Sequence, residues 1–298
     1  MATDLTDVLV GAVDLHRHGY PEISERLRTP LSDVDDVRLC RDAGMAATVL
    51  KSHTWPTTGR AQLIEQAVPG IRVVPSVTLN HFAGGMRPEI IELAARQGAR
   101  VVYLPTAGAR SDILRGGISQ RIAGEITHYH PDPDEGVVVT NDDGELTEMF
   151  RKCLDVLDEW PMLVYSGHLS APEALAILRD GRLRDRFVLS HPDSHSIGAS
   201  DSEVVTAAGL GAYIEICALG VHPKIDRVTP ADLARTVRAV GAERCVITSD
   251  YFFPWSPPSS VTLHEFAVAL FDEGITRDEL DLMLKTNPRR LIGLTGDE

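Results

Sequence analysis

The stretch LVGAVDLHRHGYPE at residues 9–22 decides the fold class, because it is an apolar run that ends in histidines instead of glycines. A doubly wound sheet usually carries a glycine-rich GxGxxG turn after its first strand, and this sequence has none. A run that is apolar nearly throughout is typical of a strand buried on both faces. Seven similar runs follow, at residues 45–53, 71–81, 99–106, 161–168, 186–191, 211–217 and 244–250.

Amphipathic segments separate these runs, among them residues 32–44, 87–98, 171–180 and 229–241. Residues suited to helix caps and helix ends flank them. The N-cap candidates are Ser32, Ser170 and Thr229, and the glycines at expected helix ends are Gly44, Gly98, Gly209 and Gly241. Strands that each precede a helix predict an α/β protein, a (β/α)8 TIM barrel, with residues 1–298 as a single domain. A doubly wound open sheet is the alternative.

Composition limits the classes of partner. The chain has 298 residues, with 29 Lys plus Arg against 43 Asp plus Glu, so its formal net charge is −14. An acidic surface repels phosphate backbones and anionic lipid, so we expect neither nucleic acid nor membrane as a partner. The sequence shows no signal peptide and no apolar run near the ~20 residues of a membrane span. Scattered cysteines without CxxC spacing agree with a cytoplasmic protein, and a homodimer is left open.

The interval between the fourth and fifth apolar runs is much longer than the others and contains an insertion at residues 107–145. Within it, GEITHYHPDPDEGVVVTND at residues 124–142 predicts a β-hairpin around a Pro/Asp/Gly turn. An insertion after a barrel strand emerges on the active-site face, so it is expected to be a substrate lid or a surface ornament. The acidic turn at 132–135 should face solvent, and residues 137–139 should be packed.

Six of the 11 histidines stand at or just past the ends of predicted strands. They are His16, His18, His53, His81, His168 and His191. The C-terminal ends of barrel strands meet at one mouth, so we expect these side chains to lie together. Imidazoles buried together need polar partners, and a divalent metal ion supplies one. The pattern therefore predicts a site for one or two divalent ions.

The pair His16 and His18 is the sharpest local feature. Residues i and i+2 of a strand point to the same side, so both imidazoles can reach one metal ion. Asp250, in CVITSDYF, follows the eighth predicted strand. A carboxylate beside a metal can bind it and can also take a proton from water.

This order of residues resembles the amidohydrolase superfamily of metal-dependent barrel hydrolases. There, HxH ends strand one, single histidines end strands five and six, and an aspartate ends strand eight; the positions here are His16, His18, His168, His191 and Asp250. NPRRLIGL at residues 287–294 is similar to the NPA-x-LLGL ending common in the superfamily. The runs VLKSH, RVVPSVTLNHFAGGMRPE, VVYLPT, GHLS and SHPD look like a bacterial amidohydrolase-like family of largely unknown function. The resemblance implies hydrolysis of an amide, ester or lactone-type bond of a small molecule by metal-activated water, with Zn, Fe or Mn.

The sequence departs from the better-known hydrolases at strand four, which ends VVYLPT without the bridging carboxylated lysine or glutamate. Lys51 and His53, on one face of the second predicted strand, are expected to substitute. Lys51 would carry a carbamate or hold an anionic substrate, and a lysine extending from the barrel rim is the alternative. The predicted catalytic residues are Asp250 and Lys51, and the predicted metal ligands are His16, His18, His53, His168, His191 and Asp250.

Four further residues are candidates for supporting the ligands or contacting substrate: His81, Glu215, Tyr103 and His195. His81 in LNHFAGG would equally brace a loop. Glu215 in YIEI is expected to be a ligand, to orient one, or to pair with Lys51. Aromatic residues of YFFPWSPP at 251–258 indicate that part of the pocket is apolar.

Two other functions stay open. A histidine-rich site without the usual bridge also suits iron, and the barrel resembles more distantly a dinuclear iron monooxygenase type that hydroxylates terpenoid natural-product intermediates. The other alternative is a non-catalytic metal- or ligand-binding barrel. Serine-hydrolase, NTPase and thiol-redox functions lack their motifs, because no GxSxG, P-loop or CxxC is present.

Overall fold

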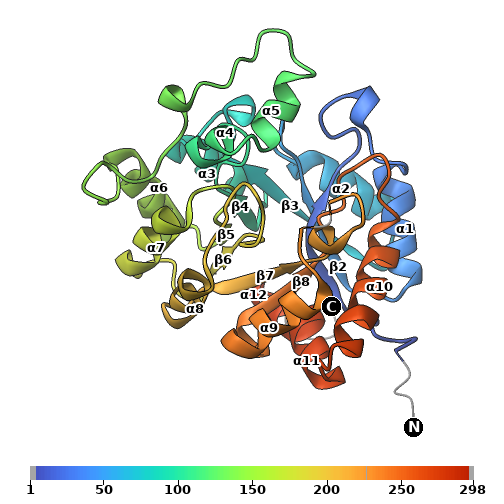
Figure 1. Cartoon of the computed structure of the whole chain (residues 1–298). Helices are drawn as coiled ribbons and strands as arrows, with labels where there is room; N and C mark the ends of the chain where they lie inside the picture. Colours follow the sequence, from blue (N-terminus) through green and yellow to red (C-terminus); the bar gives the residue numbers. More distant parts are fainter. Residues whose placement is uncertain (1–4, 226, 295–298) are drawn as a thin grey trace. The chain divides into compact units, whose positions relative to one another are not determined.

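The computed structural model describes residues 5–225 and 227–294. The described residues form eight strands that follow one another in the sheet in chain order, and the pairs from β1 to β7 are parallel. Their bounds are β1 (Val13–His18), β2 (Ala47–Lys51), β3 (Arg72–Thr78), β4 (Val101–Tyr103), β5 (Leu163–Tyr165), β6 (Phe187–Leu189), β7 (Tyr213–Cys217) and β8 (Cys245–Thr248) (Figure 1). Every predicted strand is therefore present.

Helices connect the strands. The α-helices are α1 (Asp33–Asp42), α2 (Thr58–Ala67), α3 (Pro88–Arg96), α4 (Arg110–Leu114), α5 (Ile118–Ala123), α6 (Glu148–Glu159), α7 (Ala171–Asp180), α8 (Asp201–Gly209), α9 (Pro230–Val240), α10 (Ser259–Asp272), α11 (Arg277–Asp281) and α12 (Asn287–Leu291). Short 3-10 segments are η1 (Glu25–Leu27), η2 (His81–Ala83), η3 (Pro133–Glu135), η4 (Ala218–Val221) and η5 (Ala242–Arg244), and η6 (Leu282–Thr286) is a π-helix. None of the helices in the described residues has the length and apolarity needed to cross a membrane.

Strand β1 lies beside the end of β8. The amide of Asp250 donates to the carbonyl of His16 at 2.9 Å, and the amide of His18 donates to the carbonyl of Tyr251 at 3.0 Å. Sequential parallel strands with intervening helices, and a first strand next to the last, are the (β/α)8 barrel topology. The predicted fold class is confirmed, and the doubly wound sheet is excluded because its strand order would not follow the chain.

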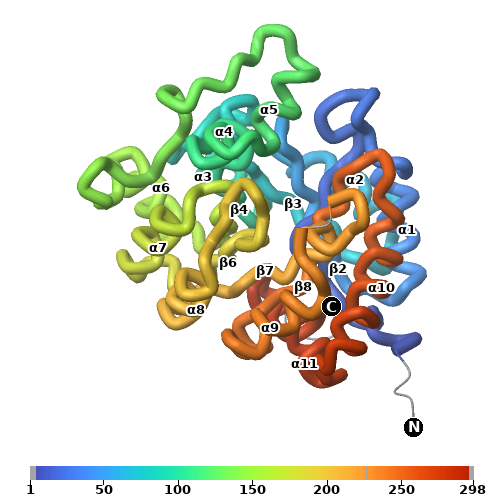
Figure 2. The backbone as a smooth tube through the Cα atoms, viewed as in Figure 1, coloured from blue at the N-terminus to red at the C-terminus, as the bar shows by residue number. Residues whose placement is uncertain are grey.

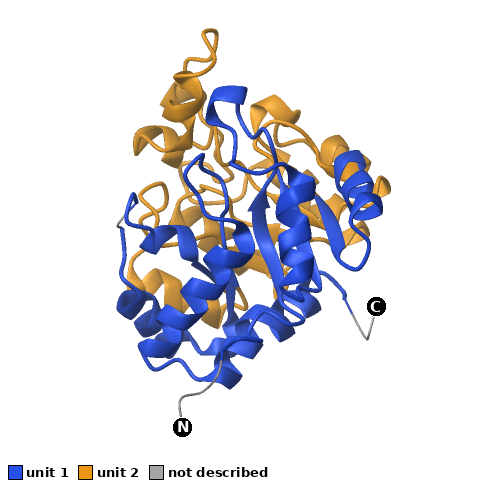
Figure 3. Ribbon diagram, turned by 90° about the vertical axis from the view of Figure 1, so that its right-hand side faces the viewer, with its two compact units in different colours: residues 1–51, 59–75, 215–298 blue, residues 52–58, 76–214 orange. Residues whose placement is uncertain are grey.

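The chain divides into two compact units (Figure 3). Unit 1 is built from the described parts of residues 1–51, 59–75 and 215–298, and unit 2 from residues 52–58 and 76–214. The single domain stays a prediction. His16, His18, Lys51, Glu215 and Asp250 belong to unit 1, whereas His53, His81, Tyr103, His168, His191 and His195 belong to unit 2.

The helix boundaries follow the local chemistry of the sequence. Ser32 caps α1 with its hydroxyl, which accepts a hydrogen bond from the amide of Asp35. Ser170 before α7 and Thr229 before α9 each form a capping box with the acidic residue three positions on. Such caps satisfy amides that the first helical turn leaves without partners. The cap residues that the sequence predicts are therefore confirmed.

The predicted hairpin at residues 124–142 is wrong. The insertion instead contains α4, α5 and the short η3, joined by loop (Figure 2). Two prolines, Pro131 and Pro133, lack the amide hydrogens that a strand ladder needs, and the amide of Val137 donates to the carbonyl of Gly108 at 2.7 Å. The acidic residues Asp132, Asp134 and Glu135 are exposed, as predicted, whereas of residues 137–139 only Val139 is fully buried and the other two are half-buried.

The motif NPRRLIGL has a structural place in unit 1. Asn287, at the start of α12, is buried, and its amide donates to the carbonyls of Ala242 at 2.9 Å and Cys245 at 2.8 Å. Cys245 begins β8, the strand that Asp250 follows. The asparagine of this motif therefore anchors the start of β8.

Candidate metal centre

Unit 1 gathers three of the predicted ligands. His16 and His18, both on β1, are each 1% exposed, and both imidazoles face Asp250, as expected for residues two apart on a strand. Their Nε2 atoms lie 3.2 and 3.1 Å from the same oxygen, Oδ1 of Asp250. The potential ligand atoms of these three residues all lie within 4.8 Å of one another.

The other nitrogen of each imidazole is held by a buried carboxylate. Nδ1 of His16 lies 2.7 Å from Oε1 of Glu215, which also accepts the hydroxyl of Thr248 at 2.8 Å. Nδ1 of His18 lies 2.9 Å from Oε1 of Glu22, a residue only 1% exposed. A carboxylate at Nδ1 places the hydrogen there and leaves the lone pair on Nε2. Of the roles predicted for Glu215, the structure shows the orientation of a histidine.

The residues present fit a divalent metal ion. Both Nε2 lone pairs and Oδ1 of Asp250 are acceptors that face one another at about hydrogen-bond distance. Three converging acceptors are stabilised by a cation, which is either the ammonium of Lys51, 2.8 Å from Nε2 of His16, or a metal ion. Two imidazole nitrogens with one carboxylate oxygen suit Zn, Fe or Mn. In metal-binding histidines, the ring nitrogen that does not bind the metal commonly donates to a carboxylate, and Glu215 and Glu22 take this place at Nδ1 of His16 and His18. This chemistry, and not proximity alone, makes the cluster a candidate metal centre.

Asp250 occupies an unusual backbone conformation. Its φ of +48° lies in the left-handed region, which aspartate enters more readily than most residues. The hydrogen bond from its own amide to His16 and the bond from the Tyr251 amide to the hydroxyl of Ser249 at 3.2 Å hold the turn. Strand β8 ends two residues earlier, at Thr248, so this turn directs the carboxylate toward the histidines. Strain at such a position often marks a functional site.

Lys51 ends β2 and is only 2% exposed. Its Nζ lies 2.8 Å from Nε2 of His16, so the rim-lysine alternative is wrong. Burial lowers the pKa of Lys51, against Asp250 and Glu215, which raise it. The amine of Lys51 is therefore buried in direct contact with the candidate ligand His16.

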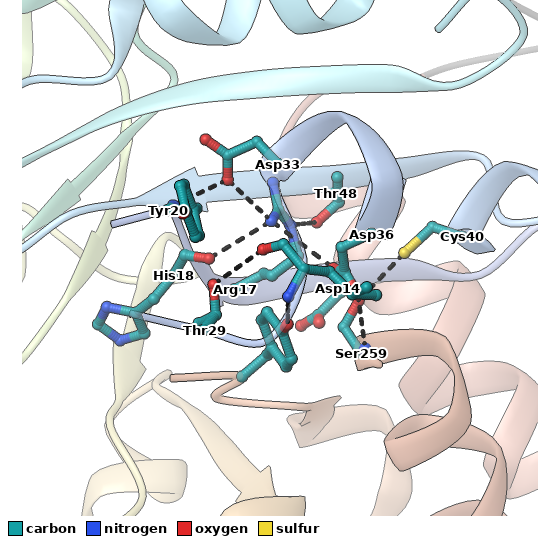
Figure 4. A network of polar contacts seen from close by, with 12 residues as sticks. Asp14, Arg17, His18, Tyr20, Thr29, Asp33, Asp36, Cys40, Thr48 and Ser259 are labelled. Carbon is teal, nitrogen blue, oxygen red and sulfur yellow. Dashed lines mark hydrogen bonds and ion pairs between the residues drawn. The ribbon is translucent and has the colours of Figure 1, made fainter. Parts of the chain in front are cut away.

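A second buried network holds β1 from its other side (Figure 4). Arg17, between the two histidines, points away from them, and its guanidinium lies 3.3 Å from Asp33 and 3.6 Å from Asp36 of α1. Asp36 in turn accepts the amide and hydroxyl of Ser259, at the start of α10, at 3.0 and 2.7 Å. Arg17 therefore ties the strand that carries both histidines to two helices.

Unit 2 brings His168 and His191 together, with ring centroids 5.2 Å apart. Nδ1 of His168 lies 2.6 Å from Oδ1 of Asp112, a fully buried carboxylate on α4. Burial alone would raise the pKa of Asp112, but His168 and the hydrogen bonds from Ser119 outweigh it and lower the pKa to about 2. His168 thus contacts a buried carboxylate through Nδ1, as His16 and His18 each do.

Gly167 sets the position of His168. Its φ is +59°, and a Cβ there would lie 2.1 Å from the carbonyl oxygen of Leu104 and 2.6 Å from that of Pro105. The amide of His168 donates to the Pro105 carbonyl at 2.9 Å. Only glycine allows the two loops to approach so closely.

The remaining predicted residues lie in unit 2 with different surroundings. His53 is buried but stands two residues past the end of β2, so the shared-face argument with Lys51 does not extend to it. Tyr103 is fully buried and packs on Tyr165 at 4.8 Å between ring centroids. His81 and His195 are exposed. His81 begins η2, where its backbone carbonyl accepts the amide of Gly84 at 3.2 Å, and a loop-bracing role of its side chain stays a prediction.

Sequence reasoning missed Glu22 and Asp112. Glu22 stands four residues after His18 in HRHGYPE, and that short spacing was the one available signal. Asp112 lies 56 positions from His168, so its role depends on tertiary structure alone.

We expect Glu22→Gln to weaken metal binding by about 10–100-fold while the fold is retained, because the neutral amide holds the His18 ring less firmly. Titration of zinc against a competing chelator measures this change. Glu25→Gln is the matched control, since Glu25 is exposed and pairs with Arg28 on the surface. Equal affinities of the Glu22 and Glu25 variants would contradict the assigned role of Glu22.

The fold has relatives among solved structures. An amidohydrolase from Pseudomonas aeruginosa superposes with a TM-score of 0.60 at 11% identity, over 96% of this chain and 97% of its own. A 2,6-dihydroxybenzoate decarboxylase from Rhizobium gives 0.61 at 13%, over 97% and 100%. A variant of organophosphorus hydrolase from Deinococcus radiodurans gives 0.58 at 16%, over 97% and 95%. At these identities the likeness concerns the fold, and it confirms the amidohydrolase resemblance at that level.

Sequence comparison identifies the family. Among curated proteins, none matches the chain. A family described as a family of unknown function, DUF6282, matches residues 11–215. The matched range includes His16, His18, His168 and His191 and ends at Glu215, so Asp250 lies outside it. Because the match spans more than half of the sequence, the chain belongs to this family of unknown function, DUF6282.

Proposed function

We propose that the chain is a metal-dependent enzyme of the amidohydrolase type that hydrolyses an amide, ester or lactone-type bond of a small molecule. The observation that carries the proposal is the convergence of His16 Nε2, His18 Nε2 and Asp250 Oδ1, with Glu215 and Glu22 behind the two rings. A divalent ion held there would polarise a carbonyl and lower the pKa of a water molecule. His53, His168 and His191 remain proposed ligands, on the sequence argument from strand ends.

The residues of unit 1 have separate tasks in this proposal. Asp250 is the most exposed of the three, with 13% of its side chain accessible against 1% for each histidine. Its carboxylate is therefore the group that meets water and substrate and takes a proton from the attacking water. Lys51 holds an anionic part of the substrate with its ammonium group, or carries a carbamate. Phe252, whose ring lies 4.9 Å from that of His18, gives the site an apolar wall.

An oxidative reaction is the second candidate. Two histidines and one carboxylate are also the ligand set of non-haem iron oxygenases, and unit 1 presents this set in His16, His18 and Asp250. An iron monooxygenase acting on a terpenoid-like intermediate therefore stays a proposal. A barrel that binds metal without turnover is the remaining alternative.

Anaerobic purification followed by elemental analysis distinguishes these functions. Bound zinc or manganese, with ester or lactone hydrolysis that proceeds without O2, is the result expected for the hydrolase. Bound iron with product formation that consumes O2 would favour the monooxygenase. Metal-replete protein without turnover on broad panels of esters, lactones and amides, with or without O2, would contradict both.

A further inference from the structure

The insertion after β4 contacts the two loops that carry His168 and His191. Asp112 of α4 reaches Nδ1 of His168 at 2.6 Å. Next to it, the hydroxyl of Ser111 donates to the carbonyl of Ser196, in the loop after β6, at 3.0 Å. The first part of the insertion, residues 107–123, is thus bonded to the segments that follow β5 and β6.

The carboxylate of Asp112 is fixed by the turn between α4 and α5. Its Oδ1 accepts the amide of Ile118 at 3.0 Å, and its Oδ2 accepts the amide of Ser119 at 2.8 Å. Gly117 leaves no room for a side chain, because a Cβ there would lie 2.0 Å from Oδ1 of Asp112 and 2.4 Å from the hydroxyl of Ser196. The sequence GGIS at 116–119 therefore forms a pocket for this carboxylate, which holds it against His168.

A carboxylate fixed in this way decides the tautomer of the histidine. The bond to Asp112 is favourable with the hydrogen on Nδ1, which leaves the lone pair of His168 on Nε2. A histidine that binds metal through Nε2 needs this tautomer and a fixed ring orientation. A neutral partner would let the other tautomer compete.

We propose that Asp112 is the positioning residue of His168, and that residues 107–123 are an integral part of the site instead of a removable lid. The assignment of His168 to the metal rests on the proposed function, whereas its tautomer and orientation do not. The second part of the insertion differs, since Asp132, Asp134 and Glu135 are exposed. Any lid motion would be confined to that second part.

Nuclear magnetic resonance of the full chain with 15N-labelled histidine, after chelation of metal, tests the tautomer directly. The His168 signals are identified by their loss in His168→Ala. We expect the Nδ1–H tautomer in the wild type and a raised share of the Nε2–H tautomer in Asp112→Asn. Asp134→Asn is the matched control, because it removes the same charge from an exposed position of the same insertion. A wild-type Nε2–H tautomer, or an Asp112→Asn spectrum equal to the wild type, would overturn the inference.

Zinc titration of the same variants separates this inference from the proposed function. If both hold, Asp112→Asn weakens zinc binding by about 10–100-fold and His168→Ala weakens it further. A shifted tautomer with unchanged zinc affinity in both variants would support the positioning role and remove His168 from the ligand set. Lower zinc affinity in His168→Ala alone, with the tautomer unchanged in Asp112→Asn, would keep the ligand and remove the positioning role.

Discussion

Asp250→Asn is expected to abolish activity and to weaken metal binding by at least about 100-fold. Removing the charge of a residue that binds the metal directly costs more affinity than removing a residue that only hydrogen-bonds to a ligand, for which the loss is about 10–100-fold. Both histidines face the same oxygen, Oδ1, so an amide at this position places either a donor or a weaker acceptor among three converging groups. The substitution keeps the side-chain shape. Turnover and bound metal, measured on one preparation, check the prediction.

The chain supplies a close control for this substitution. Asp185 is the other non-glycine residue with positive φ in the described chain, at +64°, and it is exposed. Asp185→Asn makes the same chemical change in the same backbone region, so it should leave metal content and turnover unchanged. If the Asp250 variant kept full metal content, Asp250 would be removed from the ligand set.

The core of this site was predictable from sequence because a short-range rule and the barrel topology suffice to bring its residues together. The period-2 rule places His16 and His18 on one face of β1, and the end of β8 brings Asp250 to the same place. The eight strands were equally readable, because a buried parallel strand must be apolar on both faces. The N-caps at Ser32 and Thr229 followed from side-chain chemistry within one turn.

Contacts that neither the strand pattern nor the barrel topology specifies were not predictable. Asp112 acquires its role from a histidine 56 positions away. The expected hairpin failed because Val137 pairs with Gly108, near the start of the insertion, and not with the residues before the turn. The burial of Lys51 beside His16 was not predictable either, because a lysine at the end of a strand can extend to the barrel rim or lie in the interior.

Arg17→Met should lower the free energy of unfolding by about 3–5 kcal/mol, the usual cost of removing one partner from a buried ion pair. Arg17 is 1% exposed, and its loss leaves the buried Asp36 without this cation. Urea denaturation followed by circular dichroism measures the change. Arg38→Met is the control, because Arg38 and Asp35 are both about half exposed on the same helix, where a pair contributes at most about 1 kcal/mol.

A double variant shows whether the loss comes from an uncompensated charge. Adding Asp36→Asn to Arg17→Met removes the buried carboxylate charge, while the amide oxygen still accepts the hydrogen bond from Ser259. If the charge is the cause, the double variant is more stable than Arg17→Met alone, and the two effects are not additive. An Arg17→Met protein as stable as the Arg38 control would show that β1 does not depend on this network. The position of His16 and His18 would then be set by the strand pairing with β2 and by the bonds to Asp250 and Tyr251.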